Sequence, residues 1–202
     1  KELKVTDVKL TAQGNANDYQ LSLFGNSQLG AYPTVNFNSQ INGSLSEANL
    51  KKLALKANDS QATIQANVDW QNGVSANFSG ALSSLKAQYL TDTLTSDISG
   101  QFKGAFVTSS NSWKLSMDDT QLSGLLNDVP LNFAAQFNLN DELKATVNKF
   151  NLSSGTNRLT LTGEVDQQWQ INGAIALQSN DDAKLPFIAN GKADLSIRGE
   201  RL

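Results

Sequence analysis

The 202-residue chain contains no cysteine and no histidine. The absence of cysteine excludes disulfides, a thiolate nucleophile, and cysteine-ligated zinc or iron–sulfur sites. The absence of histidine removes the commonest general base and the imidazole ligand of many catalytic metal sites. We therefore expect no catalytic residues, no metal and no cofactor, and the sequence does not indicate an enzyme.

Charged residues are scarce too, at 17% of the chain compared with about 25% in an average globular domain. Sixteen basic and nineteen acidic residues give a net charge of −3, and no basic cluster is present that would neutralise a run of phosphates. Nucleic acid is therefore not an expected partner. Uncharged polar residues, including 22 asparagines, replace the missing charges, as is common in exported bacterial β proteins.

The sequence has no run of about 18 apolar residues, so we expect no transmembrane helix in this segment. It begins at Lys1, without an initiator methionine or a signal peptide, and residues 199–202 stop within a strand-like pattern. We interpret the chain as an internal segment of a longer protein.

Alternation of apolar and polar residues is the main pattern that is present. Small or apolar residues occupy every second position over residues 19–23, 35–37, 62–68, 159–165 and 171–177. This period of two predicts half-buried β-strands. Pairs that favour tight turns recur about every ten residues, as in an antiparallel meander. They are Asn42-Gly43, Asn58-Asp59, Asn72-Gly73, Asn127-Asp128, Asn140-Asp141, Ser154-Gly155, Asn172-Gly173 and Asn190-Gly191.

Helical patterns are limited to two stretches. Residues 80–94 carry Leu82 and Leu85 at helix-like spacing, and residues 46–55 show a weaker i, i+3 pattern. Serine and threonine are poor residues for a helix interior, so we expect at most one or two helical turns at either place. We expect an all-β chain.

An internal repeat is the most informative feature of the sequence. Residues 52–69 align without a gap on residues 149–166, an offset of 97 residues, and their apolar positions match. Pro33 matches Pro130, and Trp70 matches Trp169, in the same order. We expect tandem repeats of about 97 residues, one over residues 1–106, with residues 1–14 left over from a preceding unit, and one over residues 113–202.

Five short segments resemble the repeat of the TamB family, which belongs to the wider AsmA-like group of bridge proteins. They are residues 113–116 (WKLS), 121–124 (QLSG), 129–131 (VPL), 159–163 (LTLTG) and 169–173 (WQING). The resemblance covers residues 95–202 directly and the first 95 residues through the internal repeat. TamB is the inner-membrane-anchored subunit of the translocation and assembly module of Gram-negative bacteria, so the resemblance implies a periplasmic segment.

The resemblance implies a long, elongated antiparallel sheet that is curled into an open, U-shaped gutter, or β-taco, with an apolar concave face. It implies a bridge that conducts phospholipid between the two membranes and supports the assembly of outer-membrane proteins such as autotransporters. The partners would be phospholipid acyl chains in this segment, and a TamA-like barrel of the outer membrane contacted through other regions. The family defines no catalytic residues.

The alternation identifies the residues that would line the hydrophobic groove. They are Leu21, Leu23, Val35, Phe37, Leu53, Leu55, Ile64, Val68, Leu115, Met117, Leu131, Phe133, Phe150, Leu152, Leu159, Leu161, Val165, Ile171 and Ile175. Alternation does not distinguish an open groove from the core of a closed sandwich, such as an adhesin or a carbohydrate-binding domain. A third hypothesis is a chaperone or scaffold whose edge strands pair with strands of outer-membrane proteins.

Adjacent carboxylates occur at Asp118-Asp119, Asp141-Glu142 and Asp181-Asp182. We interpret all three pairs as solvated acids in turns, because adjacent residues of a strand point to opposite faces and the EF-hand pattern is missing. The aromatic residues at strand spacing either fill a core or line the groove. They are Trp70, Phe78, Trp113, Phe133, Phe137, Phe150, Trp169 and Phe187.

Overall fold

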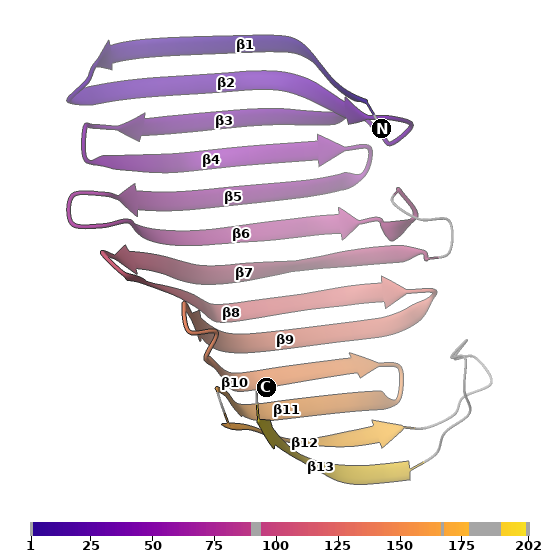
Figure 1. Cartoon of the computed structure of the whole chain (residues 1–202). Helices are drawn as coiled ribbons and strands as arrows, with labels where there is room; N and C mark the ends of the chain where they lie inside the picture. Colours follow the sequence, from indigo (N-terminus) through magenta and orange to yellow (C-terminus); the bar gives the residue numbers. More distant parts are fainter. Residues whose placement is uncertain (1, 90–93, 167, 178–190, 201–202) are drawn as a thin grey trace.

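The chain forms one 13-stranded antiparallel sheet in which every strand pairs with the strands before and after it in sequence (Figure 1). This computed structural model describes residues 2–89, 94–166, 168–177 and 191–200. The prediction of an all-β antiparallel meander is confirmed. The first and last strands lie at opposite edges of the sheet (Figure 1).

The strands are nine to fifteen residues long. They are β1 (Leu3–Asn15), β2 (Asp18–Leu29), β3 (Val35–Gly43), β4 (Glu47–Ala57), β5 (Ser60–Asp69), β6 (Ser75–Leu85), β7 (Ser96–Ser109), β8 (Ser112–Leu126), β9 (Val129–Asn140), β10 (Ala145–Ser154), β11 (Asn157–Val165), β12 (Gln168–Leu177) and β13 (Gly191–Glu200). A single turn of 3₁₀-helix, η1 (Ala87–Tyr89), precedes β7.

Several hairpins form where turn residues were expected. Asn58 has a φ of 50°, and Asn127 and Asp128 have φ values of 49° and 65°, in the left-handed region that these residues tolerate. Gly155 has a φ of 57° in the turn between β10 and β11. The expected turn at Asn172-Gly173 is wrong, because both residues lie inside β12.

Gly173 is needed for packing rather than for a turn. It lies directly opposite Leu161 of β11. A Cβ atom at this position would collide with the carbonyl oxygen of Thr160 and would lie 2.8 Å from Cδ2 of Leu161. Glycine in a strand interior often marks such a close approach.

The helix expected within residues 46–55 is also wrong, because β4 covers most of that stretch. Leu50 and Leu53 are three residues apart, yet both face the same side of the sheet, because a β-bulge inserts an extra residue at Lys51-Lys52. The pairing of β6 with β7 shifts in the same way between Leu82 and Leu85. Within the described residues of the stretch 80–94, helix is limited to η1.

The sheet is neither closed nor strongly curled, so the expected U-shaped gutter is not present (Figure 1). All extensive packing joins neighbouring strands, and the closed-sandwich alternative is wrong because the described chain forms one sheet. Alternation determines which residues share a face, whereas sheet curvature depends on twist and bulges. The expectation of curl came from the family resemblance.

The expected repeat units correspond to β2–β7 and β8–β13, six strands each. Ile64 of β5 and Leu161 of β11 lie on the same face, because direct cross-strand pairs connect them. The intervening residues are Gly80, Phe102, Thr120, Ala135 and Phe150. The division of the chain into two repeats stays a prediction.

The single layer leaves almost nothing fully buried. Ala135, at 4% exposure, is the one buried hydrophobic residue in the described part of the chain. The total accessible surface is 13235 Å². A compact monomer of this mass would expose about 9,200 Å². The single sheet contributes to this excess, because no second layer among residues 2–89, 94–166, 168–177 and 191–200 covers the apolar side chains of one face.

Candidate functional site

The cross-strand register places all nineteen residues of the expected groove on one face of the sheet, which we call the apolar face. Residues that pair directly in antiparallel strands point to the same side, so the pairing connects these residues from β2 to β12. Each of the nineteen is half-buried, partly covered by its neighbours on the face. Whether this face holds a ligand stays a prediction.

The apolar face also contains large residues that the expected set omitted. They include Ile41, Leu50, Phe78, Leu82, Phe102, Phe106, Leu122, Phe137, Leu139 and Val147, and all are half-buried. The search for alternation missed several of them at bulges, because a bulge changes the spacing between successive residues of the apolar face from two to three. A spacing of three between two alternating runs, as in Val147 and Phe150, is the signal that identifies them.

Aromatic side chains of the apolar face occupy the space above glycines of neighbouring strands. Phe37 lies directly opposite Gly25, and Phe78 lies opposite Gly104. A Cβ atom at Gly104 would lie 2.7 Å from Cζ of Phe78. The rings therefore rest against the sheet itself, an arrangement that shields glycine backbone in designed and natural sheets.

The remaining aromatics of the expected set have different environments. Phe133 and Phe150 form an edge-to-face pair with centroids 5.4 Å apart, and the Trp113 ring lies 6.3 Å from that of Phe106. Trp70 is 39% exposed, and its Nε1 donates to the carbonyl oxygen of Leu45 at 2.7 Å. The Trp169 side chain and Phe187 lie outside the described residues.

The opposite face, which we call the polar face, consists mainly of Asn, Gln, Ser, Thr and Lys. Of the carboxylate pairs, Asp141-Glu142 lies after β9, where a turn was expected. Asp118-Asp119 lies instead at a bulge in the middle of β8, where the pairing with β7 and β9 shifts register. The expected turn at this pair is wrong, because a bulge accepts polar residues in mid-strand as a turn does. Asp181-Asp182 lies outside the described residues.

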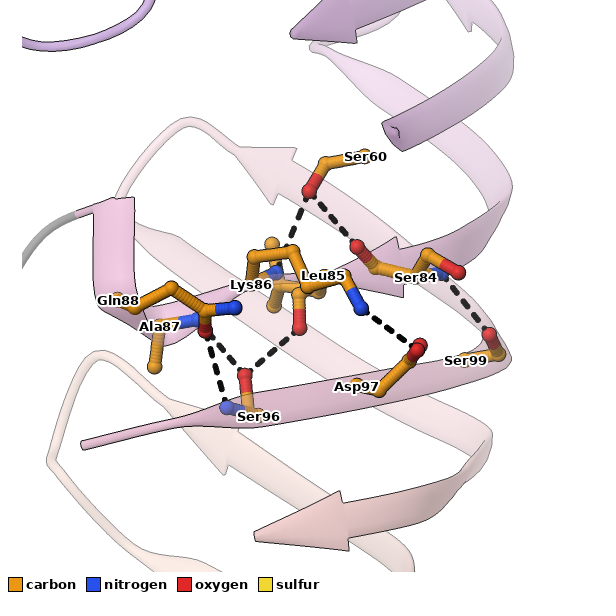
Figure 2. A network of polar contacts seen from close by, with 9 residues as sticks. All are labelled: Ser60, Ser84, Leu85, Lys86, Ala87, Gln88, Ser96, Asp97 and Ser99. Carbon is orange, nitrogen blue, oxygen red and sulfur yellow. Dashed lines mark hydrogen bonds and ion pairs between the residues drawn. The ribbon is translucent and has the colours of Figure 1, made fainter. Parts of the chain in front are cut away.

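Hydrogen bonds of serine hydroxyls stabilise the connection between β6 and β7 (Figure 2). Ser96, which is 6% exposed, donates from Oγ to the carbonyl oxygen of Leu85 and accepts from the amide of Ala87, both at 2.7 Å. Ser60 Oγ donates to the carbonyl oxygen of Ser84 at 2.7 Å, where a φ of 52° disrupts the ladder. These hydroxyls pair backbone groups that the bulge leaves without ladder partners.

One ion pair completes this network. Lys86 Nζ lies 2.6 Å from Oδ2 of Asp97 (Figure 2). The hydrogen bond with Lys86 lowers the pKa of Asp97, and the bond with Asp97 raises the pKa of Lys86. The network lies in a connection within the sheet and stabilises it, so we assign it a structural role. No group of three or more acidic residues among those described is arranged to hold a metal ion.

A family model described as "TamB, N-terminal domain" matches residues 1–202. The chain belongs to the TamB N-terminal domain family. The resemblance that the short segments indicated is therefore confirmed.

A TamB relative from Haemophilus influenzae, "Translocation and assembly module subunit TamB", is 23% identical over 165 residues. The match covers 81% of this chain and 13% of the relative, so the chain spans a small part of that protein's length. No solved structure matches the chain. Among the described residues of this TamB-family chain, no helix has the length and apolar character required to cross a membrane.

Proposed function

We propose that this chain is a periplasmic part of a bridge between the inner and outer membranes, and that its apolar face carries the acyl chains of phospholipids. The bridge also supports the assembly of outer-membrane proteins. The observation that carries the proposal is the large, uncovered apolar face of a single-layer sheet. TamB-family membership supports the setting in the bacterial envelope.

The size of the apolar face supports a ligand that covers it. Twelve spacings between thirteen strands give a length of about 58 Å, and ten residues of strand give a width of about 33 Å. The product, about 1,900 Å², is several times the largest apolar patch of about 300–600 Å² on a typical soluble monomer. A face of this size is costly to expose to water, and acyl chains of lipids supply the apolar surface that would cover it.

The mechanism that follows is passive. Acyl chains lie against the aliphatic and aromatic side chains while the lipid headgroups remain in water. Each buried methylene contributes about 0.8 kcal/mol, so a lipid on the face avoids much of the cost of entering the aqueous compartment. The half-buried side chains remain accessible to a ligand because no second layer formed by the described residues covers them.

The partners in this proposal are phospholipid in this segment and a TamA-like barrel of the outer membrane, which other regions of the whole protein would contact. The relative from Haemophilus influenzae carries the name of a translocation and assembly module subunit, which supports this assignment. The family supports a role in assembly rather than catalysis.

Native mass spectrometry of the chain, purified from a bacterial host, tests the proposal. We expect the spectrum to contain adducts with the masses of phospholipids, which dissociate at higher collision energy. A chain that purifies as a folded monomer with no lipid adduct, and takes up none from phosphatidylethanolamine vesicles, would contradict lipid binding.

A second candidate function is a scaffold whose edge strand pairs with strands of incoming outer-membrane proteins. The favouring observation is β1, which is exposed along all thirteen residues and pairs among the described strands with β2 alone. Leu3 and Leu10 are 63% and 65% exposed. A free strand edge is a template for β-augmentation. Isotope-edited infrared spectroscopy of added strand peptides would show new sheet pairing if this candidate is correct, and unpaired peptide if it is wrong.

A further inference from the structure

A hollow of about 540 Å³ lies on the polar face, over the strands from β4 to β8. Its lining includes Lys52, Gln65, Ser79, Lys103 and Asp119. The volume falls within the range of about 300–1,000 Å³ that is usual for small-molecule sites. Apart from Gly80 and Phe102, the residues that line the hollow belong to the polar face. A lipid held on the apolar face would therefore leave the polar side chains of the hollow free.

The hollow has a structural cause. Ser79 of β6 lies directly between Gln65 of β5 and Lys103 of β7, so a short side chain stands between two long ones. A bulge borders the hollow on each side, in β4 at Lys51-Lys52 and in β8 at Asp118-Asp119. Bulges bend the strand and redirect side chains, and they are frequent beside functional sites.

The β4 bulge is itself fixed from inside the hollow. Gln65 Nε2 donates to the carbonyl oxygen of Lys51 at 3.1 Å. Lys51 and Lys52 are both exposed, because the bulge interrupts the alternation of β4 at the border of the hollow. This bulge therefore fixes the backbone position from which the Lys52 side chain reaches the hollow.

The charges in the hollow are not neutralised by one another. Lys103 and Asp119 are direct cross-strand partners, yet among the described residues neither Lys52 nor Lys103 forms an ion pair. Asp119 accepts instead from Nε2 of Gln121, at 3.0 and 3.1 Å to its two oxygens. Two ammonium groups and one carboxylate therefore face the hollow with capacity for a ligand.

We propose that this hollow binds a small zwitterion, namely a short peptide with free termini. The peptide carboxylate lies between Lys52 and Lys103, and the peptide ammonium lies at Asp119. Three strand spacings, about 14 Å, separate β4 from β7, and β8 follows one spacing later. Four spacings, about 19 Å, therefore separate β4 from β8. The side chains of Lys52 and Asp119 reach across about half of this distance, and an extended tripeptide of about 10 Å matches the remainder. The side chains of Gln65 and Ser79 supply hydrogen bonds to the peptide backbone.

The test is a titration of the ¹⁵N-labelled chain with trialanine, followed by nuclear magnetic resonance. We expect saturable shifts of the amide signals of Ser79, Lys103 and Asp119. Replacing either lysine by glutamine weakens binding about two- to fivefold, as expected for an exposed ion pair. Lys56 and Lys114 are exposed lysines that do not line the hollow, so Lys56→Gln and Lys114→Gln serve as matched controls that leave binding unchanged.

Peptides with blocked termini test the contributions of the peptide ammonium and the peptide carboxylate separately. N-acetyl-trialanine should bind more weakly to the unaltered chain, and its affinity should not change in Asp119→Asn. Absence of saturable shifts, or equal binding of a peptide blocked at both ends, would overturn the proposal, as would equal weakening by the control lysine variants. Circular dichroism confirms that each variant is folded. Lipid adducts in native mass spectrometry should be the same in all these variants. A negative result of the peptide titration would therefore leave the proposal of lipid binding intact, and the reverse also holds.

Discussion

Replacing Leu161 with aspartate places a carboxylate in the middle of the apolar face. Leu161 is half-buried between Phe150 of β10 and Gly173 of β12, which are its direct cross-strand partners. A fully buried leucine contributes about 1.5–3 kcal/mol, so the loss of half of that burial costs about 0.8–1.5 kcal/mol. On an open face the new carboxylate reaches water, and no further large penalty arises.

A closed core would respond differently. There the same aspartate would be an unpaired buried charge, and the free energy of unfolding would fall by more than about 4 kcal/mol or the chain would not fold. The matched control is Thr162→Asp on the exposed polar face, with an expected change within about 0.5 kcal/mol. Thr160 is a poorer control, because its hydroxyl accepts from the amide of Ala174 at 3.2 Å.

Urea denaturation followed by circular dichroism measures both variants. We expect Leu161→Asp to remain folded in water with a midpoint slightly below that of the unaltered chain, and to lose phospholipid adducts in native mass spectrometry. Unfolding of Leu161→Asp in the absence of urea would refute the reasoning that this face is open.

Three further predictions concern stability. The lowered pKa of Asp97 and the raised pKa of Lys86 mean that their ion pair stabilises the fold between their ordinary pKa values of 3.8 and 10.5. Stability should fall as pH drops below 3.8, and urea midpoints measured against pH should show a smaller acid loss in Asp97→Asn. Ser96→Ala removes two part-buried hydrogen bonds, to the carbonyl of Leu85 and from the amide of Ala87, so we expect a loss of about 1–3 kcal/mol in urea denaturation. A change below about 0.5 kcal/mol would show that water replaces the hydroxyl. Gly173→Ala forces a Cβ against β11 and should cost about 1–3 kcal/mol by thermal melting, whereas an unchanged melting temperature would mean that β12 shifts freely.

The apolar face could be predicted from the sequence because side-chain alternation directly reports which residues share a face. Residues such as Leu159, Leu161 and Val165 keep the period of two throughout β11, and all lie where alternation predicts. Alternation fails to predict which residues share a face where a bulge interrupts the strand. Leu50 and Leu53 have a helical spacing in the sequence, but an extra strand residue between them is what keeps both on the apolar face.

Curvature could not be predicted from the residues. An open sheet, a curled sheet and a sandwich share one alternation, and only contacts beyond neighbouring strands distinguish them. The Asn172-Gly173 pair shows the same limit locally, since a turn and a close approach of two strands both require glycine. The hollow on the polar face was missed because Asp118-Asp119 has the composition of a turn.

Site-specific crosslinking tests the central claim, that lipid lies on the apolar face, most directly. A photoreactive amino acid is placed at position 161 in one variant and at position 162 in another, so that adjacent residues of β11 report on the two faces. After irradiation in bacterial cells, we expect phospholipid adducts from position 161 and none from position 162. Adducts of equal yield at both positions, or none at position 161 in a folded chain, would contradict the account.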